Sequence, residues 1–206
     1  MNKNEVKKLL KRREEMVGLH EKLENDSDDK NNSDIVNGIY KNQRNSINGT
    51  LLDIDKQLYK YVIEDPVGKW LIQIKGITTY LAAGLLAYFN VKNKDCAAQF
   101  IKYAGADNYN NPHNNNVRKL IDGISNNFRI YPESLYGELF RNKLNEIIHD
   151  TDIELPIACI RADRYMRKVF ISHLFEEMYR EENDGQLPSR YNSDSVIIEP
   201  EVPYTK

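Results

Sequence analysis

The first 63 residues carry apolar side chains at the spacing of an α-helix. Apolar residues recur at intervals of three, four and seven from Val6 to Leu23, and a second stripe runs from Ile35 to Val62. This spacing places them on one face of a helix. A polar stretch at 25–33 separates the two patterns, and its last residue, Ser33, or Asp34 after it, is suited to cap the second helix. The sequence therefore predicts helices over 5–24 and about 34–63.

The narrow stripes leave open how these two helices pack. Such helices form an antiparallel pair, join a coiled coil with a partner chain, or pack on the rest of the protein. Basic side chains are dense on the first helix, within two turns from Lys7 to Arg13. We expect an N-terminal antiparallel or coiled-coil helix pair over residues 1–65, and homo-oligomerisation through these helices.

The chain after residue 65 is also predicted to be helical. Pro66 and Gly68 mark a boundary, and an apolar segment follows up to Tyr103. Further helices are expected over 117–128, from Pro132 to 148 and from Pro156 to about 181, with a loop at 105–116. Period-two alternation is suggested only at 195–199. We therefore expect an all-α fold, with a compact helical domain over 66–182 and an extended C-terminal tail over 183–206.

A tight turn between two short helices is centred on Gly76. Glycine is suited to the positive φ that such a turn requires. Ile74 and Ile77 are expected to point inward, and Thr78 or Thr79 to cap the second helix through its hydroxyl. The small residues at 82–84 allow the two helices to approach closely.

This turn is also a candidate for phosphate binding. Free amide N–H groups at the turn and at the following helix N-terminus suit a phosphate oxygen, and Lys75 adds positive charge. Contacts of this kind bind the nucleic-acid backbone without reading bases. The alternative interpretation is a tight helix–helix turn that binds no ligand.

The pattern Ile74-Lys75-Gly76-Ile77, followed by small residues at 82–84 and by Tyr103-Ala104-Gly105, resembles a known family. It is similar to the C-terminal helix-hairpin-helix domain of RNA-guided insertion-sequence transposases, in which a hairpin of the form I-P-G-I-G leads to an A-A-Y-A-G-L element. Weaker similarity continues to about residue 180. The resemblance implies a nucleic-acid-binding module of the kind carried by phages and mobile elements.

Two departures from this family bear on activity. The family's second hairpin glycine is Thr78 here, which crowds the place where a phosphate would approach. Only about 65 residues precede the match, too few for the transposases' α/β catalytic domain, and the loop at 106–116 lacks the family's nucleophilic serine. We therefore expect a protein that is not an enzyme.

Local charge supports nucleic-acid binding better than total charge does. The formal net charge is -2, whereas the segment from Pro66 to Ile124 carries about four more basic than acidic residues. Basic residues at 161–168 form a second patch, for which a solvated helix face is the better explanation. The expected nucleic-acid-binding residues are Lys75, Gly76, Ile77, Thr78, Thr79, Lys102, Arg118, Lys119, Arg161 and Arg164.

Other features narrow the remaining function classes. The two cysteines lack disulfide or zinc spacing, the histidines lie far apart, and the acidic cluster at 150–154 is best explained as a loop, so no metal or cofactor is expected. The N-terminus lacks a signal peptide, and the longest apolar patch, at 80–89, is too short to span a bilayer. These features predict a soluble cytoplasmic protein with no membrane partner.

The sequence thus leaves two main hypotheses. In the first, the chain binds duplex DNA with low sequence specificity through the hairpin, with RNA still open as a target. In the second, it is a protein–protein interaction or structural adaptor whose hairpin no longer binds nucleic acid.

Overall fold

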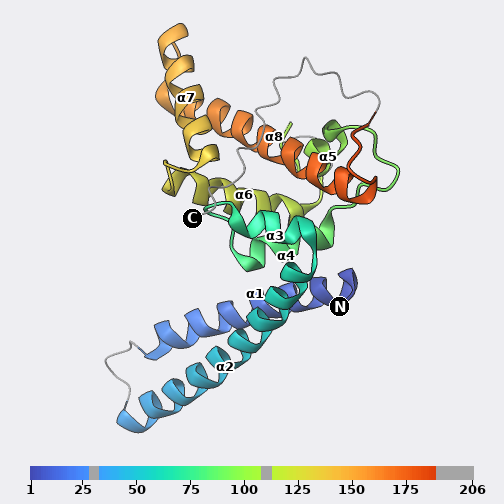
Figure 1. Ribbon diagram of the computed structural model, residues 1–206. Coiled ribbons are helices and arrows are strands. Elements are labelled where there is room, and N and C mark those ends of the chain that lie inside the picture. The colour runs from blue at the N-terminus through green and yellow to red at the C-terminus, as the bar shows by residue number, and fades with distance from the viewer. Residues whose placement is uncertain (28–32, 108–112, 189–206) are drawn as a thin grey trace.

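The computed structural model describes residues 1–27, 33–107 and 113–188, and these form eight α-helices and no strand (Figure 1). The predicted all-α fold is therefore confirmed. The helices are α1 (Lys3–Ser27), α2 (Asp34–Glu64), α3 (Pro66–Gln73), α4 (Thr79–Tyr88), α5 (Ala97–Tyr103), α6 (Asn115–Ile130), α7 (Leu135–Asp150) and α8 (Leu155–Glu182). The suggested alternation at 195–199 and most of the predicted tail lie outside the described residues.

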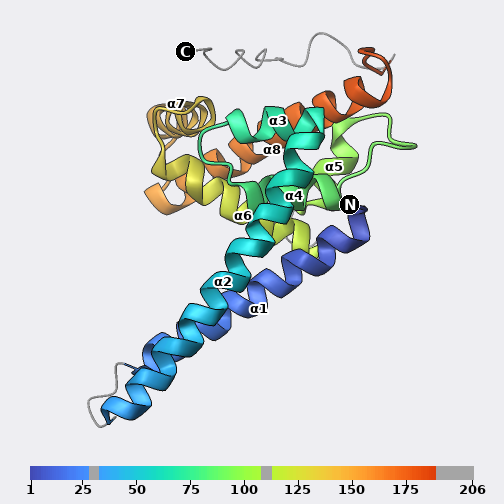
Figure 2. The same ribbon diagram turned by 60° about the horizontal axis from the view of Figure 1, so that its bottom comes forward.

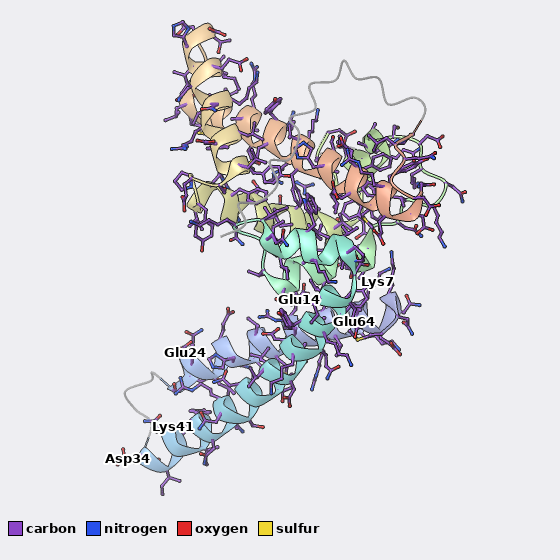
Figure 3. The ribbon with its side chains drawn as sticks, in the orientation of Figure 1. Lys7, Glu14, Glu24, Asp34, Lys41 and Glu64 are labelled. Atoms are coloured by element: carbon purple, nitrogen blue, oxygen red, sulfur yellow. The ribbon has the colours of Figure 1, made fainter. Side chains whose placement is uncertain are left out.

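Helices α1 and α2 form an antiparallel pair, here called the N-terminal arm, whose far half extends away from the other helices (Figures 1 and 2). At 1.5 Å per residue, α2 is about 46 Å long. An ion pair from Arg13 Nε to Asp55 Oδ1, 2.6 Å, joins the two helices. In Figure 3, Glu24 and Lys41 lie on the free half of the arm, whereas Lys7 lies beside the other helices. The expected antiparallel helix pair is therefore present.

The arm joins the rest of the chain through a sharp, capped junction. Asp65 ends α2 and also caps α3, because its side chain accepts a hydrogen bond from the Gly68 amide at 3.1 Å. Pro66 occupies the first turn of α3, where a missing N–H costs nothing. A Cβ on Gly68 would collide with the backbone carbonyl of Val62. The close approach of α2 and α3 therefore requires glycine at position 68.

Helix α4 lies at the centre of the described structure. All residues from Leu81 to Ala87 are buried, and α4 contacts α1, α2, α3 and α6. Gly84 allows α6 to approach closely, since a Cβ there would lie 2.6 Å from a methyl of Leu120. A helix surrounded in this way must be apolar on every face, as α4 is.

Helices α6, α7 and α8 share a second, aromatic part of the core. Phe128 of α6 stacks on Tyr136 of α7 with ring centroids 4.6 Å apart, and both rings contact Phe170 of α8. The predicted start of α7 at Pro132 is wrong by three residues. The Ser134 hydroxyl accepts from the Gly137 amide at 3.1 Å, so this cap begins the helix at Leu135.

No helix in the described part of the chain has both the length and the apolar character that a membrane span requires.

Candidate nucleic-acid interface

The turn predicted around Gly76 is present between α3 and α4. Gly76 has a φ of 102°, the left-handed conformation that glycine adopts without strain. Thr78, rather than Thr79, caps α4, and its hydroxyl accepts from the Leu81 amide at 3.4 Å. Ile77 is buried beneath the turn. The positive φ at Gly76 and the threonine cap of α4 are therefore as predicted.

One side of this turn is covered by the C-terminal end of α6. The Asn127 side chain donates to the Gly76 carbonyl at 2.7 Å, and a Cβ on Gly76 would lie 3.2 Å from the Phe128 ring. These contacts give the turn a structural role that needs no ligand. The first amides of α4, which have no partner within the helix, follow the turn and suit an incoming phosphate.

Lys75 is engaged by neighbouring side chains instead of standing alone beside the turn. Its ammonium group forms an ion pair with Glu133 and lies 5.3 Å from the centre of the Tyr131 ring. The hydrogen bond from Lys75 holds the pKa of Glu133 below its ordinary value. Both side chains are more than half exposed, so the pair adds little stability. It does place a carboxylate beside the predicted phosphate site.

The remaining predicted residues do not gather around the turn. Gly76 packs against Asn127, whereas Arg118 and Lys119 lie in the first turns of α6, about 12–14 Å away along the helix axis. Lys102 is in the last turn of α5. Arg161 and Arg164 belong to α8, and α8 packs on α5, α6 and α7. The ten predicted residues therefore lie on four different elements: the hairpin turn, α5, α6 and α8.

A different surface carries concentrated positive charge. A groove of about 490 Å³ lies between α1, α4 and α6, and we call it the basic groove. It is lined by Lys7, Lys8, Leu10, Lys11 and Glu14 of α1, Tyr80 and Tyr88 of α4, and Asn116 and Leu120 of α6. None of the ten predicted residues lines the groove, although Thr79 and Lys119 each adjoin a lining residue in the sequence.

The groove exists because α1 runs antiparallel to α4 with one face buried. Val6 and Leu10 are buried in the core, and lysines at the intervening positions line the groove. At one end of α4, the Lys7 ammonium lies 4.9 Å from the Tyr88 ring centre. At the other end, the Tyr80 hydroxyl donates to Glu14 at 2.6 Å. Since Tyr80 is the second residue of α4, the groove begins where the hairpin turn ends.

The lining of the groove has an excess of positive charge. It contains three lysines and one glutamate. Lys8 and Lys11 make no ion pair with any carboxylate of the described residues, and both are exposed. Glu14 is engaged by Tyr80, and burial, together with this hydrogen bond, raises the pKa of Tyr80. The groove therefore presents a net attractive field to an anion.

The aromatic rings of the groove are not open for base stacking. Lys7 covers the ring of Tyr88, and the Arg13 guanidinium lies 5.0 Å from the centre of the Tyr80 ring. Stacking a base would require these cations to move, whereas a phosphate could bind beside them. The arrangement suits backbone contacts rather than base recognition.

The sequence analysis did not identify this groove as a site. The signal was visible as the density of basic residues from Lys7 to Arg13, but that helix was assigned to self-association. Arg12 and Arg13 are in fact paired, with Glu15 and Asp55. Only the structure separates the paired arginines from the available lysines.

No protein-family model and no curated protein matches this chain. The similarity of the hairpin to the transposase module therefore stays a prediction. Within the described ranges, no three histidine, cysteine or acidic side chains are grouped so as to hold a metal ion.

Proposed function

We propose that the chain binds the phosphate backbone of nucleic acid, with duplex DNA as the preferred target, and does so without cleaving it. The observation that carries this proposal is the basic groove, where Lys8 and Lys11 have no carboxylate partner among the described residues. Lysines that bind the phosphate backbone release the counterions condensed on the nucleic acid, and this release favours binding to any sequence. Low sequence specificity follows, because lysine contacts to the phosphate backbone carry no sequence information.

The hairpin has a secondary role in this proposal. The first amides of α4 lie at the end of the groove, where they can receive a further phosphate of the same strand. Lys75 contributes less than the sequence suggested, because Glu133 already neutralises it locally.

The test is the salt dependence of binding to a labelled DNA duplex, followed by fluorescence anisotropy. In the double variant Lys8→Gln with Lys11→Gln, the affinity should fall by the same factor for duplexes of unrelated sequence. The slope of log affinity against log salt should become shallower by about 1.8, or by about 1.4 if the target is single-stranded. Folding of the variant is checked by circular dichroism.

Two controls make the result specific. Lys41→Gln with Lys56→Gln removes two exposed lysines of α2 that line neither groove and should leave both affinity and slope close to the parent's. Lys75→Gln should change binding little. If Lys75→Gln weakens binding as much as the groove variant does, or if the groove variant binds normally, the groove is not the principal contact.

Self-association through the N-terminal arm is a second part of the proposal. Leu19, Ile35 and Ile39 are exposed on its free half, and a shallow groove of about 450 Å³ includes Leu19, Leu23 and Ile47. Two helices alone cannot cover these apolar side chains, whereas a second arm can. Analytical ultracentrifugation should show a dimer that Leu19→Lys with Ile39→Lys converts to monomer, and an unchanged dimer would contradict this part.

The adaptor function keeps one specific observation in its favour. Four large aliphatic side chains near the end of α7 or the start of α8 are exposed, namely Ile148, Leu155, Ile157 and Ile160. Exposed apolar clusters are typical of protein-binding surfaces. If the parent chain shifts neither duplex nor single-stranded nucleic acid at low salt, the adaptor function replaces nucleic-acid binding.

A further inference from the structure

A second concentration of positive charge lies in a pocket lined by residues of α6 and α8. This pocket has a volume of about 180 Å³, and we call it the arginine pocket. Three arginines line it, Arg129 from α6 with Arg164 and Arg167 from α8, and its single acidic lining residue is Asp163. Ala106 and Ile160 contribute an apolar wall.

The carboxylate in the pocket is already committed. The Ser125 hydroxyl donates to one oxygen of Asp163, and Arg167 Nε lies 2.6 Å from the other oxygen. Both side chains are mostly buried, with 14% exposure for Arg167 and 16% for Asp163. Asp163 and Arg167 together form a fixed floor for the pocket.

The other two arginines are less engaged: Arg129 has one long ion pair, with Asp163 at 4.0 Å, and Arg164 makes no ion pair or hydrogen bond with any described residue. Asp122, just outside the pocket, pairs with Arg167 but also with Arg118 at 3.9 Å. The formal excess is therefore two positive charges, whether or not Arg118 and Asp122 are included.

Size and charge together select the ligand. A phosphate group has five heavy atoms and is comparable in bulk with five water molecules, about 150 Å³, whereas a whole nucleotide is larger than the pocket. A guanidinium group presents a planar fork of N–H donors that matches phosphate oxygens. A phosphomonoester carries up to two negative charges at neutral pH, whereas a backbone phosphodiester carries one.

We propose that the arginine pocket binds a phosphomonoester in its doubly charged form. Arg164 and Arg129 donate hydrogen bonds to it, and Arg167, held in place by Asp163, forms the floor of the pocket. The phosphate belongs either to the end of a nucleic-acid strand or to a small free molecule. The pocket is separate from the basic groove, so it can fail or succeed independently of the proposed backbone binding.

The experiment is calorimetric titration of the full chain with inorganic phosphate near pH 7.5. Arg164→Gln should weaken phosphate binding at least tenfold, because it removes the donor that has no other partner. Arg164→Lys keeps the positive charge but loses the planar fork of N–H donors. Its phosphate affinity should lie between those of the parent and Arg164→Gln. The matched control is Arg161→Gln, one turn earlier on α8 and exposed, which should bind as the parent does.

Two further measurements identify the source and the charge of the ligand. A 5′-phosphorylated oligonucleotide should bind more tightly than its 5′-hydroxyl form if the phosphate is a strand end, and both should bind equally if it is a free molecule. Binding should weaken below about pH 6, where a phosphomonoester gains a proton. Absence of phosphate binding by the parent chain, or equal loss in Arg161→Gln and Arg164→Gln, would overturn the proposal.

The basic groove is tested separately in the same titration. Lys8→Gln with Lys11→Gln should keep its binding of inorganic phosphate. Loss of phosphate binding in this variant would mean that the ion binds in the groove, which would also overturn the assignment to the arginine pocket.

Discussion

Gly137, in the first turn of α7, offers a strong test of how the α6–α7 turn is packed. A Cβ at this position would lie less than 3 Å from three backbone atoms, namely the Tyr131 carbonyl oxygen, the Phe128 carbonyl oxygen at 2.7 Å and Pro132 Cα at 2.9 Å. Side-chain ends can rotate away from such a contact, but these atoms move only if the turn itself moves. Gly137→Ala should therefore displace α7 from α6.

The overpacking caused by Gly137→Ala opposes the gain in helix propensity that alanine brings. Overpacking costs up to about 3 kcal/mol, and alanine in place of glycine gains about 1 kcal/mol in a helix. The net loss in the free energy of unfolding is then about 2 kcal/mol, or about 4–8 °C in Tm for a chain of this size. Urea unfolding followed by circular dichroism measures the first quantity, and a thermal scan the second.

The matched control is Gly123→Ala in α6. The added Cβ would lie 3.5 Å from a Leu81 methyl, an ordinary contact. This variant should gain up to about 1 kcal/mol from helix propensity alone. If both substitutions raise Tm, α7 does not approach α6 closely at Gly137, and the reasoning fails.

Two further predictions concern stability. Burial raises the pKa of Tyr136, so the folded state keeps a proton that the unfolded state releases above about pH 10, and stability falls there by about 1.4 kcal/mol per pH unit. Urea unfolding at pH 9 and pH 11 should show a smaller loss in Tyr136→Phe, and equal losses would contradict the assignment. Gly18, Gly38 and Gly49 of the N-terminal arm have no neighbour within 4 Å of an added Cβ. Changing each to alanine should raise the free energy of unfolding by about 0.5–1 kcal/mol; a loss in any of them, measured by urea unfolding, would indicate a hidden contact.

The helices and the turn around Gly76 could be predicted from local information. Apolar spacing sets the face of α1 and α2, and glycine followed by a threonine cap sets the start of α4. Such signals depend on a few neighbouring residues, so one sequence contains them. The start of α7 was missed for the same kind of local reason, because both Pro132 and Ser134 are helix-start signals and the cap determined the outcome.

The basic groove could not be predicted in this way. It brings Lys7 together with Tyr88 and Asn116, which lie 81 and 109 positions away in the sequence. The summed charge of the segment at 66–124 was also a poor guide to the binding surface, because its excess basic residues are spread over several faces. Lys75 faces Glu133, Lys92 pairs with Glu182 at 3.6 Å, and Arg118 lies beside Asp122.

The way the arm is built has a consequence for its motion. Its inner half shares the core through Leu10, Leu58 and Val62, while beyond Met16 no residue of α1 is buried. Local opening costs least where few apolar groups are covered. Backbone amides should therefore exchange with heavy water fastest near Glu24 and Asp34 and slowest beside α4, so that the arm unzips from its tip while its base stays closed.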